Sequence, residues 1–346
     1  MSIRSIYKKI LPLNLRKQLW MGLRWPGQQL RNFYSTHAIK VVKIFYRWEK
    51  GTLFAPASSR KTILFYPYLP VDEYGHLAIK LCYVLGYEMS NDPAKPFHLF
   101  IEYEDSTIRK RDEEYLRILE GQGVVNLHCR DIGKSRIDRA FEKIFGYSVM
   151  VDPLTYRGKI VKKTERNAEH DGRILEGPLK SKESGFVYQR LINNACGKKE
   201  VYDIRVPILQ DEIPYIFYKY RNVNDRFNHY TFSKLIENMD EVLSKEELVK
   251  IRAFCKEISM DLGELDILRD VDDGRLYIVD ANNTPAGWRP LKSSVRDYYR
   301  SVKLLTDTFE RNFIQNRGQT LKPAIPQILK FPKPPDRFAL EAAKAL

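Results

Sequence analysis

Two acids and an asparagine in the C-terminal third of the chain have the chemistry of a magnesium site. Asp280 and Asn282 belong to the run Leu276–Asn282, in which alternate residues face opposite sides of a strand. The alternation predicts that Asp280 and Asn282 share one face and that Val279 lies on the other. Asp266 precedes them on a second strand, and oxygen ligands from paired strands suit a hard cation that also binds phosphates. We therefore expect a metal-binding hairpin here.

The turn between these strands decides where Asp266 points. A two-residue turn, Asp273-Gly274, pairs Asp266 with Ala281 and directs it away from the other two ligands. A three-residue turn, Asp272–Gly274, with its glycine in the left-handed region, pairs Asp266 with Asp280 instead. We favour the three-residue turn, which completes the metal site. The alternative is an ordinary surface hairpin with turn-forming acids.

Length and composition indicate a globular protein of more than one domain. The chain has 346 residues, of which 43% are hydrophobic and 12% aromatic. No uncharged run is long enough for a membrane-spanning helix, and the N-terminus lacks the apolar core of a secretory signal, so we expect a cytoplasmic protein. The four cysteines are far apart and have no CxxC spacing, which argues against a zinc site and a disulfide framework.

The positive charge of the chain is concentrated at its N-terminus. The formal net charge is +14, and residues 1–60 hold 12 Lys or Arg against a single acid, Glu49. Within this segment, Ile3–Ile10 and Leu15–Leu23 carry apolar residues at helical spacing, with bases between them. Such a segment fits an anionic membrane surface, at the inner membrane face, or a protein partner. A basic helix packed on its own domain is the alternative, and nucleic acid is disfavoured because the body has no basic stripe.

Alternating strand and helix patterns follow from residue 61 and predict a small α/β layer with a parallel sheet. The runs are Thr62–Tyr66, Leu77–Tyr87, Phe97–Tyr103, Glu113–Gly121 and Val124–Cys129.

A β-rich unit is predicted after a short helix, Ser135–Phe145. Its strands include Tyr147–Val151, Lys159–Lys163 and Phe186–Ile192, with a polar loop between the last two. A later helix begins at Ser244, where Glu247 three residues on completes a capping box. The predicted metal-binding hairpin follows this helix, and Val295–Asn316 reads as a closing helix.

The order of these motifs over residues 130–310 resembles the ATP-grasp superfamily, including modules found among bacterial surface-polysaccharide enzymes. The resemblance implies an α/β (α+β) ATP-grasp fold, and the patterns before it add a small N-terminal α/β domain and a basic helical N-terminal extension. Together they suggest domain boundaries of 1–60 for the extension, 61–133 for the small domain, 134–316 for the catalytic domain and 317–346 for a proline-rich tail.

The resemblance also implies ATP and Mg²⁺ as cofactors and assigns residues to them. Phosphates would contact Lys134 and Lys163, with Lys162 as the register alternative, and Arg205 of the Asp-x-Arg motif would face phosphate or substrate. The metal would bind Asp266, Asp280 and Asn282, where Asp280 replaces the usual Glu. The hinge that binds adenine through its backbone would comprise Gln189, Arg190, Leu191 and Ile192.

The glycine-rich loop typical of the family is replaced here by residues 167–172. The resemblance therefore leaves phosphate contacts in this loop to Asn167, His170 and backbone amides, and His170 could equally be a turn residue before Asp171-Gly172. Lys219, Arg221, Arg226 and Arg289 are candidates for holding an anionic substrate.

The activity implied by the resemblance is ATP-dependent ligation. A carboxylate becomes an acyl phosphate, which an amine attacks, and the acceptor is a small molecule or a glycan-linked group. A kinase acting on a sugar hydroxyl and a membrane-attached nucleotide-binding module without catalysis are the alternatives.

Overall fold

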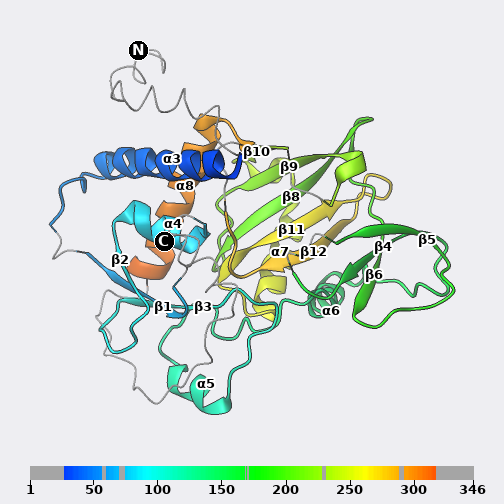
Figure 1. The fold of residues 1–346 in the computed structure, drawn as a ribbon, viewed down its shortest axis with the longest axis horizontal. Coiled ribbons are helices and arrows are strands. Elements are labelled where there is room, and N and C mark those ends of the chain that lie inside the picture. The colour runs from blue at the N-terminus through cyan, green and yellow to red at the C-terminus, as the bar shows by residue number, and fades with distance from the viewer. Residues whose placement is uncertain are drawn as a thin grey trace.

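The structure is a computed structural model that describes residues 27–56, 60–69, 75–167, 169, 171–227, 231–287 and 292–316, with side chains from residue 37. Figure 1 shows three parts: a small parallel layer at the left, a large central sheet, and a three-stranded sheet at the right. The α/β (α+β) class expected from the sequence is confirmed. No described helix is long and apolar enough to cross a membrane.

The small layer is a parallel sheet in the strand order β2-β1-β3 with helices around it. The expected strand at Val124–Cys129 is wrong, because only Val125 forms a bridge, to Ile101, before the chain turns at Asn126. The elements of this part are α3 (Gly27–Glu49), β1 (Thr62–Pro67), α4 (Leu77–Leu85), β2 (Glu88–Ser90), β3 (Leu99–Tyr103) and α5 (Glu113–Leu119).

The central sheet is antiparallel and has the strand order β10-β9-β8-β11-β12, with β7 paired to β8. One face is apolar and packs on α6 and α7, as the shared core of Phe141, Ile251, Ile204 and Leu265 shows. The other face carries the charged residues described below. The elements are α6 (Lys134–Phe145), β7 (Ala195–Cys196), β8 (Glu200–Leu209), β9 (Ile216–Asn222), β10 (Phe232–Ile236), α7 (Lys245–Glu257), β11 (Leu262–Arg269) and β12 (Leu276–Asn282).

The third sheet is antiparallel, in the order β5-β4-β6, and comprises β4 (Gly158–Thr164), β5 (Arg173–Gly177) and β6 (Phe186–Arg190). The strand expected at Tyr147–Val151 is wrong, since this segment contributes only a bridge between Met150 and Gln189. The predicted capping box at Ser244 is confirmed, because the Ser244 hydroxyl accepts from the Glu247 amide and the Glu247 carboxylate from the Ser244 amide.

The helix α3 and the closing helix α8 (Val295–Phe309) pack with the small layer. Ile39, Val42 and Tyr46 of α3 are buried in one core with residues of β1, α4 and α8. A π-helical turn, Glu310–Gln315, extends α8. The inner face of α3 thus belongs to a core of the body, although the sequence suggested an extension up to residue 60.

A buried asparagine joins the small layer to the central sheet. Asn126 is fully buried with φ of 62°, and its side-chain oxygen accepts from the amides of Asp261 and Leu262 at 2.9 and 3.0 Å. Its amide group donates to the Leu262 carbonyl at 2.7 Å and to the Asn283 carbonyl at 3.3 Å. One side chain therefore fixes the start of β11 and the end of β12 against the small layer.

We predict that Asn126→Ala lowers the free energy of unfolding by about 3 kcal/mol, because it leaves buried backbone groups without partners. Urea denaturation measures the loss. Asn126→Gly, which adopts a positive φ without strain, should recover only a minor part of it. Asn238→Ala, which removes one exposed hydrogen bond to Glu241, is the matched control and should change the stability by less than about 0.5 kcal/mol. A loss of stability below about 0.5 kcal/mol for Asn126→Ala would contradict the role of Asn126 in joining the small layer to the central sheet.

Candidate functional site

One face of the central sheet carries an ordered set of charges. Strand pairing places Asp203 opposite Lys219, Arg205 opposite Asp266, and Asp266 opposite Asp280. Residues opposite each other point to the same face. The charged residues on this face are basic on β9 and acidic on β11 and β12. Across the sheet the set is Lys219 and Arg221 on β9, Asp203 and Arg205 on β8, Glu264 and Asp266 on β11, and Asp280 and Asn282 on β12.

Most of these charges are paired within the face. Arg205 contacts Asp266 at 2.7 Å and Glu264 at 3.1 Å, and Arg221 binds Asp203. Lys219 lies 4.0 Å from Asp266. Burial opposes ionisation of Asp266, but Arg205 first and Lys219 next outweigh it, so the pKa of Asp266 is lowered. Burial, and then the neighbouring Arg205, lowers the pKa of Lys219 to about 8.

Asp280 is the acid of this face that has no ion pair within the described residues. Its carboxylate accepts a hydrogen bond from the adjacent Ala281 amide at 3.1 Å. Burial raises the pKa of Asp280, and Asp266 raises it further, while Lys134, Lys163 and Arg205 act in the opposite direction. A cation bound at Asp280 would stabilise its ionised form.

The hairpin pairs Asp266 with Asp280, as the sequence predicted, but the three-residue turn is wrong. The Asp270 amide donates to the Arg275 carbonyl, and the Gly274 amide to the Asp270 carbonyl, so four residues, 271–274, form the loop. The register then shifts between Asp266 and Ile267, which leaves one extra residue in β12. The strict alternation of β12 is therefore also wrong, and Val279 lines the same cavity as Lys163.

Lys163 and Lys162 point to opposite faces of β4. Lys163 lies within electrostatic range of Asp280, Asp203 and Asp266, and burial lowers the pKa of its ammonium group although these acids raise it. Lys162 forms an ion pair with Glu183 and lies 4.0 Å from the centre of the Phe186 ring. Of the two register alternatives, Lys163 is the lysine that faces the charged sheet.

A cavity lies beside Lys163, between the three-stranded sheet and the central sheet. Its volume is about 80 Å³, and it opens to solvent on one side. Apolar side chains form two walls, and the segment that follows β6 forms an edge. The apolar lining residues are Val149, Val161, Leu191, Ile192, Phe227, Leu268 and Val279, and the polar ones are Lys163, Gln189, Arg190, Asn194, Asp203 and Arg226.

The hinge predicted from the sequence forms that edge. The Leu191 amide donates to the Lys159 carbonyl at 2.9 Å, whereas no other described residue bonds the Leu191 carbonyl or the Ile192 amide. Arg190 donates to Tyr277 and Asp270, both at 2.9 Å, and so ties the hinge to the hairpin. The edge thus offers one backbone acceptor and one donor to a ligand.

The loop between β4 and β5, residues 165–172, is held down at three places. The Glu165 carboxylate accepts from the Ser135 amide and hydroxyl, both at 2.9 Å, and thereby caps α6. Lys134 donates to the Arg166 carbonyl. Asn167 binds Thr107 of the small layer through its amide and the Ala281 carbonyl through its side chain, both at 3.0 Å. His170 lies outside the described residues.

The Asn167 side-chain oxygen is buried without a hydrogen-bond partner within the described residues. Lys134, which is 7% exposed, is close enough to Lys163 and Asp280 to influence both pKa values. The loop and α6 therefore bring Lys134 and Asn167 to the acidic end of the charged sheet.

The predicted metal trio fits a hard cation best at Asp280. The Asn282 side-chain oxygen already accepts from the Thr284 amide at 2.8 Å, and the Thr284 hydroxyl lies 3.4 Å from it. Asp266 binds Arg205 through one carboxylate oxygen. No three His, Cys, Asp or Glu side chains form a metal site in the described ranges, and the trio contains two acids and an amide.

The four basic candidates for substrate binding separate in space. Lys219 and Arg221 lie on the charged sheet face, each side chain 12% exposed, and contact Asp266 and Asp203. Arg226 lies at the hinge, where it donates to the Ile192 carbonyl at 3.5 Å. Arg289 lies outside the described residues.

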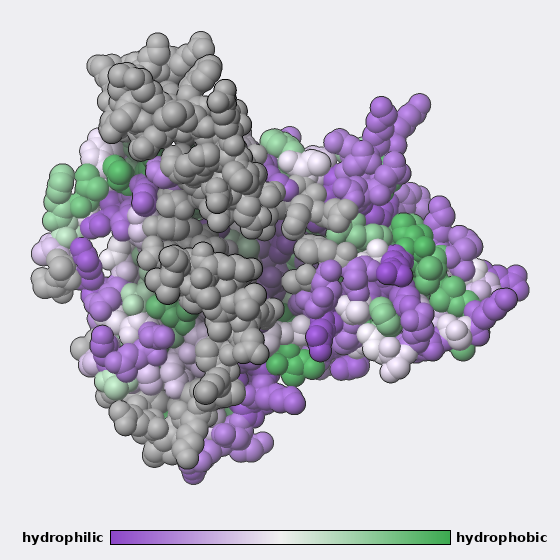
Figure 2. Space-filling view, viewed as in Figure 1, coloured by the Kyte–Doolittle hydropathy of each residue, from purple (hydrophilic) through white to green (hydrophobic). Residues whose placement is uncertain are grey.

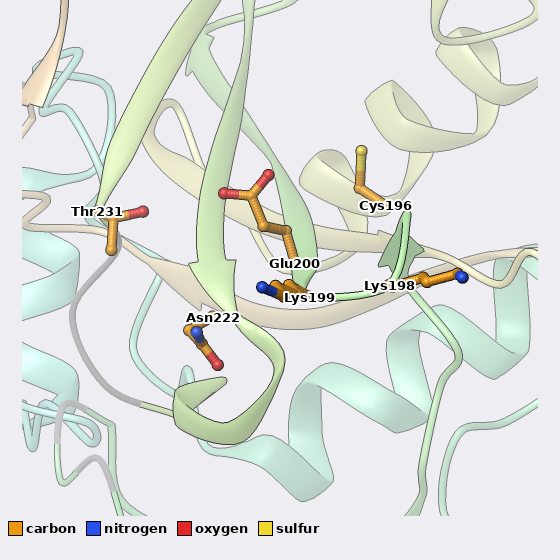
Figure 3. Close-up of a pocket in the computed structure, with 6 residues that line it drawn as sticks. All are labelled: Cys196, Lys198, Lys199, Glu200, Asn222 and Thr231. Atoms are coloured by element: carbon orange, nitrogen blue, oxygen red, sulfur yellow. The ribbon is translucent and has the colours of Figure 1, made fainter.

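A second, open groove lies where β7 turns into β8 and β9 ends, and Figure 3 shows its lining of Cys196, Lys198, Lys199, Glu200, Asn222 and Thr231. It has no apolar walls of the kind that line the hinge cavity. Its side chains come from strand ends and turns. The combination of apolar walls, a backbone edge and buried charges is found in the hinge cavity.

Comparisons with protein-family models and with proteins of described function find no match. Among solved structures, the chain is similar to D-alanine–D-alanine ligase from Bacillus anthracis, at 15% identity over 74% of this chain and 97% of that chain, with a TM-score of 0.46. It is also similar to a RimK domain ATP-grasp protein from Sphaerobacter thermophilus, at 13% identity over 73% and 98%, with a TM-score of 0.40.

A further similar structure is the ATP-grasp ligase PsnB in complex with a precursor peptide and AMPPNP, at 12% identity over 73% of this chain and 97% of that chain, with a TM-score of 0.43. Two of these three structures carry ATP-grasp in their names. Identity this low assigns neither substrate nor reaction to this chain.

Glu165 and Glu264 are site residues that the sequence did not single out. The sequence gives an indirect sign of Glu165. The helix α6 begins after Gly133, which has no side chain to cap it, so the first amides of the helix need a hydrogen-bond acceptor from another segment. A Cβ at Gly133 would lie 2.8 Å from the Glu165 carboxylate, so the glycine makes room for it. Glu264 follows from alternation with Asp266 once the strand is known.

We predict that Glu165→Ala loosens the loop between β4 and β5. Loss of a helix cap costs about 1 kcal/mol, which corresponds to roughly fivefold faster amide exchange in residues 164–167. Hydrogen exchange with mass spectrometry measures this rate. Glu142→Ala, on the exposed side of α6, is the control and should leave exchange in the loop unchanged. Equal exchange in both variants would contradict the role of Glu165.

Proposed function

We propose that this chain binds ATP with Mg²⁺ and activates a carboxylate as an acyl phosphate for attack by an amine. The observation that carries the proposal is the continuous arrangement between the two sheets, from an apolar cavity through Lys163 to Asp280. A nucleotide needs these three environments in this order: apolar walls for the base, cations for phosphates, and oxygen ligands for the metal.

The base would occupy the hinge cavity. Val149, Val161 and Val279 supply apolar surface for a flat ring, and the Leu191 carbonyl and Ile192 amide match the donor and acceptor on the adenine edge. Arg226 and Phe227 line the same cavity. The hydrogen bond from Arg190 to Asp270 would hold this edge in a fixed position relative to the acidic end of the sheet.

The phosphates would lie between Lys163, Lys134 and the loop residue Asn167. Burial lowers the pKa of the Lys163 ammonium, and a phosphate beside it would stabilise its charged form. Asp266, Asp280 and Asn282 would hold Mg²⁺. When bound, Mg²⁺ neutralises phosphate charge and polarises the transferred phosphoryl group.

Arg205 and Lys219 would then stabilise the anionic partners of the transfer. A carboxylate oxygen of the acceptor attacks the γ-phosphorus, the bond to the β-γ bridging oxygen breaks, and ADP leaves. An amine attacks the acyl carbon next and releases phosphate. Cations already oriented by Asp266, Glu264 and Asp203 require little rearrangement when negative charge develops.

The acceptor proposed is a small carboxylic acid or a glycan-linked carboxylate, as in surface-polysaccharide biosynthesis. A screen for ADP release with Mg-ATP against carboxylates and amines tests the class. Labelled phosphate recovered on the product, and none released, would indicate a kinase instead. ATP binding without ADP release over the whole panel would indicate a binding module.

We predict that Lys163→Met weakens ATP binding at least tenfold, whereas Lys162→Met changes it less than twofold. Only Lys163 faces the acids of the central sheet, and Lys162 pairs with Glu183 on the opposite side of β4. Isothermal titration with Mg-ATP measures both. Similar losses of ATP affinity in the two variants would contradict the proposal that Lys163, and not Lys162, faces the nucleotide.

We predict that Asp280→Asn reduces ATP turnover at least a hundredfold without loss of stability. Partial burial first, and then Asp266, raises the pKa of the Asp280 carboxyl, so a neutral amide there should leave the free energy of unfolding equal or higher by about 1 kcal/mol. ADP release and urea denaturation are the two readouts. Asp240→Asn, on the exposed surface, is the control. Wild-type turnover in Asp280→Asn would refute the metal assignment.

A further inference from the structure

The outer side of α3 carries an apolar stripe that no described part of the chain covers. Val41, Ile44 and Trp48 are spaced three and four residues apart, so they lie on one side of the helix. Their exposed fractions are 40, 53 and 68%. Phe54, just beyond the end of α3, is 93% exposed. We call these four residues the α3 stripe, and Figure 2 shows apolar surface over this end of α3 at the left edge of the molecule.

The opposite side of α3 is fully used in the fold. Ile39, Val42 and Tyr46 are buried at 4% exposure or less against the small layer and α8. Tyr46 donates to Asp307 of α8 at 2.9 Å. The helix therefore has two apolar sides, and packing within the described chain accounts for only one of them. Exposed apolar surface of this kind marks an interaction site.

Positive charge lies next to the stripe. Lys40 and Arg47 belong to the same helix, and Lys40 is exposed. Lys50, just after the helix, forms an ion pair with Asp307 of α8 at 2.8 Å. Glu49, the single acid in residues 1–60, is bound by Lys303 and by the Tyr299 hydroxyl of α8. Residues 1–26, which lead into α3, contain six Lys or Arg and no acid. The positive charge on this side is thus not balanced by acids of the same segment.

We propose that the α3 stripe docks the chain on an anionic lipid surface. Trp and Phe with neighbouring Lys and Arg are the residues that insert at a lipid headgroup layer, where rings enter the interface and cations contact anionic headgroups. An acidic protein would meet the charge but gives no reason for a Trp and a Phe so largely exposed to water. The stripe belongs to α3, whereas the hinge cavity lies between β4, β6 and the central sheet, so docking leaves the cavity accessible (Figure 1).

Co-sedimentation of the full-length protein with lipid vesicles tests the proposal. The probes are phosphatidylcholine vesicles and vesicles in which part of the lipid is phosphatidylglycerol. We expect binding to the anionic vesicles that falls as salt rises, and little binding to the neutral ones. The double variant Ile44→Glu, Trp48→Glu should reduce the bound fraction at least tenfold. The matched control is Val249→Glu with Val295→Glu, two exposed apolar residues on α7 and α8, and it should bind like the wild type.

Each other outcome overturns the proposal. Absence of binding would show that the stripe meets another part of the chain or a protein. Anionic binding that the α3 variant leaves unchanged would assign the contact to residues 1–26 alone. An equal loss of vesicle binding in the control variant would show that the added negative charge, and not the position of the substitutions, weakens binding. A concentration-dependent dimer that Trp48→Glu dissociates would make the stripe an interface between two copies. None of these outcomes depends on nucleotide, so the docking surface and the proposed ATP site can fail separately.

Discussion

Buried charge on one face of the central sheet is the constraint on which the site depends. Charged groups taken out of water destabilise a fold unless each finds a partner, and here the strands supply partners in register. Arg205 opposite Asp266, and Asp203 beside Arg221, satisfy most of the face. Asp280 is the exception within the described residues, and it lies nearest to Lys163 and Lys134 of the neighbouring parts. A functional cation would complete a pattern that the protein alone leaves incomplete.

The rest of the architecture keeps this face assembled. The helices α6 and α7 cover the opposite, apolar face, so that the charged side points into the space between the two sheets. Asn126 fixes the small layer to both strands of the β11–β12 hairpin, and Glu165 fixes the loop between β4 and β5 to α6. The candidate site is therefore built from separate parts of the chain that side-chain hydrogen bonds hold together.

The sequence predicted which acids of the hairpin lie opposite each other, but not the backbone that brings them there. The predicted pairing of Asp266 with Asp280 was correct, but the predicted turn was not. The loop is one residue longer than predicted, and the extra residue in β12 offsets this difference in register. Sequence periodicity gives no sign of such a bulge. The choice between Lys162 and Lys163 also depended on which side of β4 meets the second sheet, a tertiary contact.

The strand predicted at Val124–Cys129 was wrong, and the helix α3 was not predicted. The apolar run Val124–Cys129 suits a strand, yet Asn126 takes a left-handed turn because its side chain binds backbone groups about 135 residues later in the chain. The helix α3 was not predicted, since its apolar residues occupy two opposite sides and blur the helical period. One of those sides is packed in the core, and the other is the α3 stripe.

The central claim is that hinge, Lys163 and hairpin bind a single metal–nucleotide complex. A crystal structure with AMPPNP and Mn²⁺, using the anomalous signal of manganese, tests it most directly. We expect a manganese peak coordinated by Asp280 and Asp266, with the adenine edge at the Leu191 carbonyl and Ile192 amide. A nucleotide bound outside the hinge cavity, or manganese away from the hairpin, would contradict it.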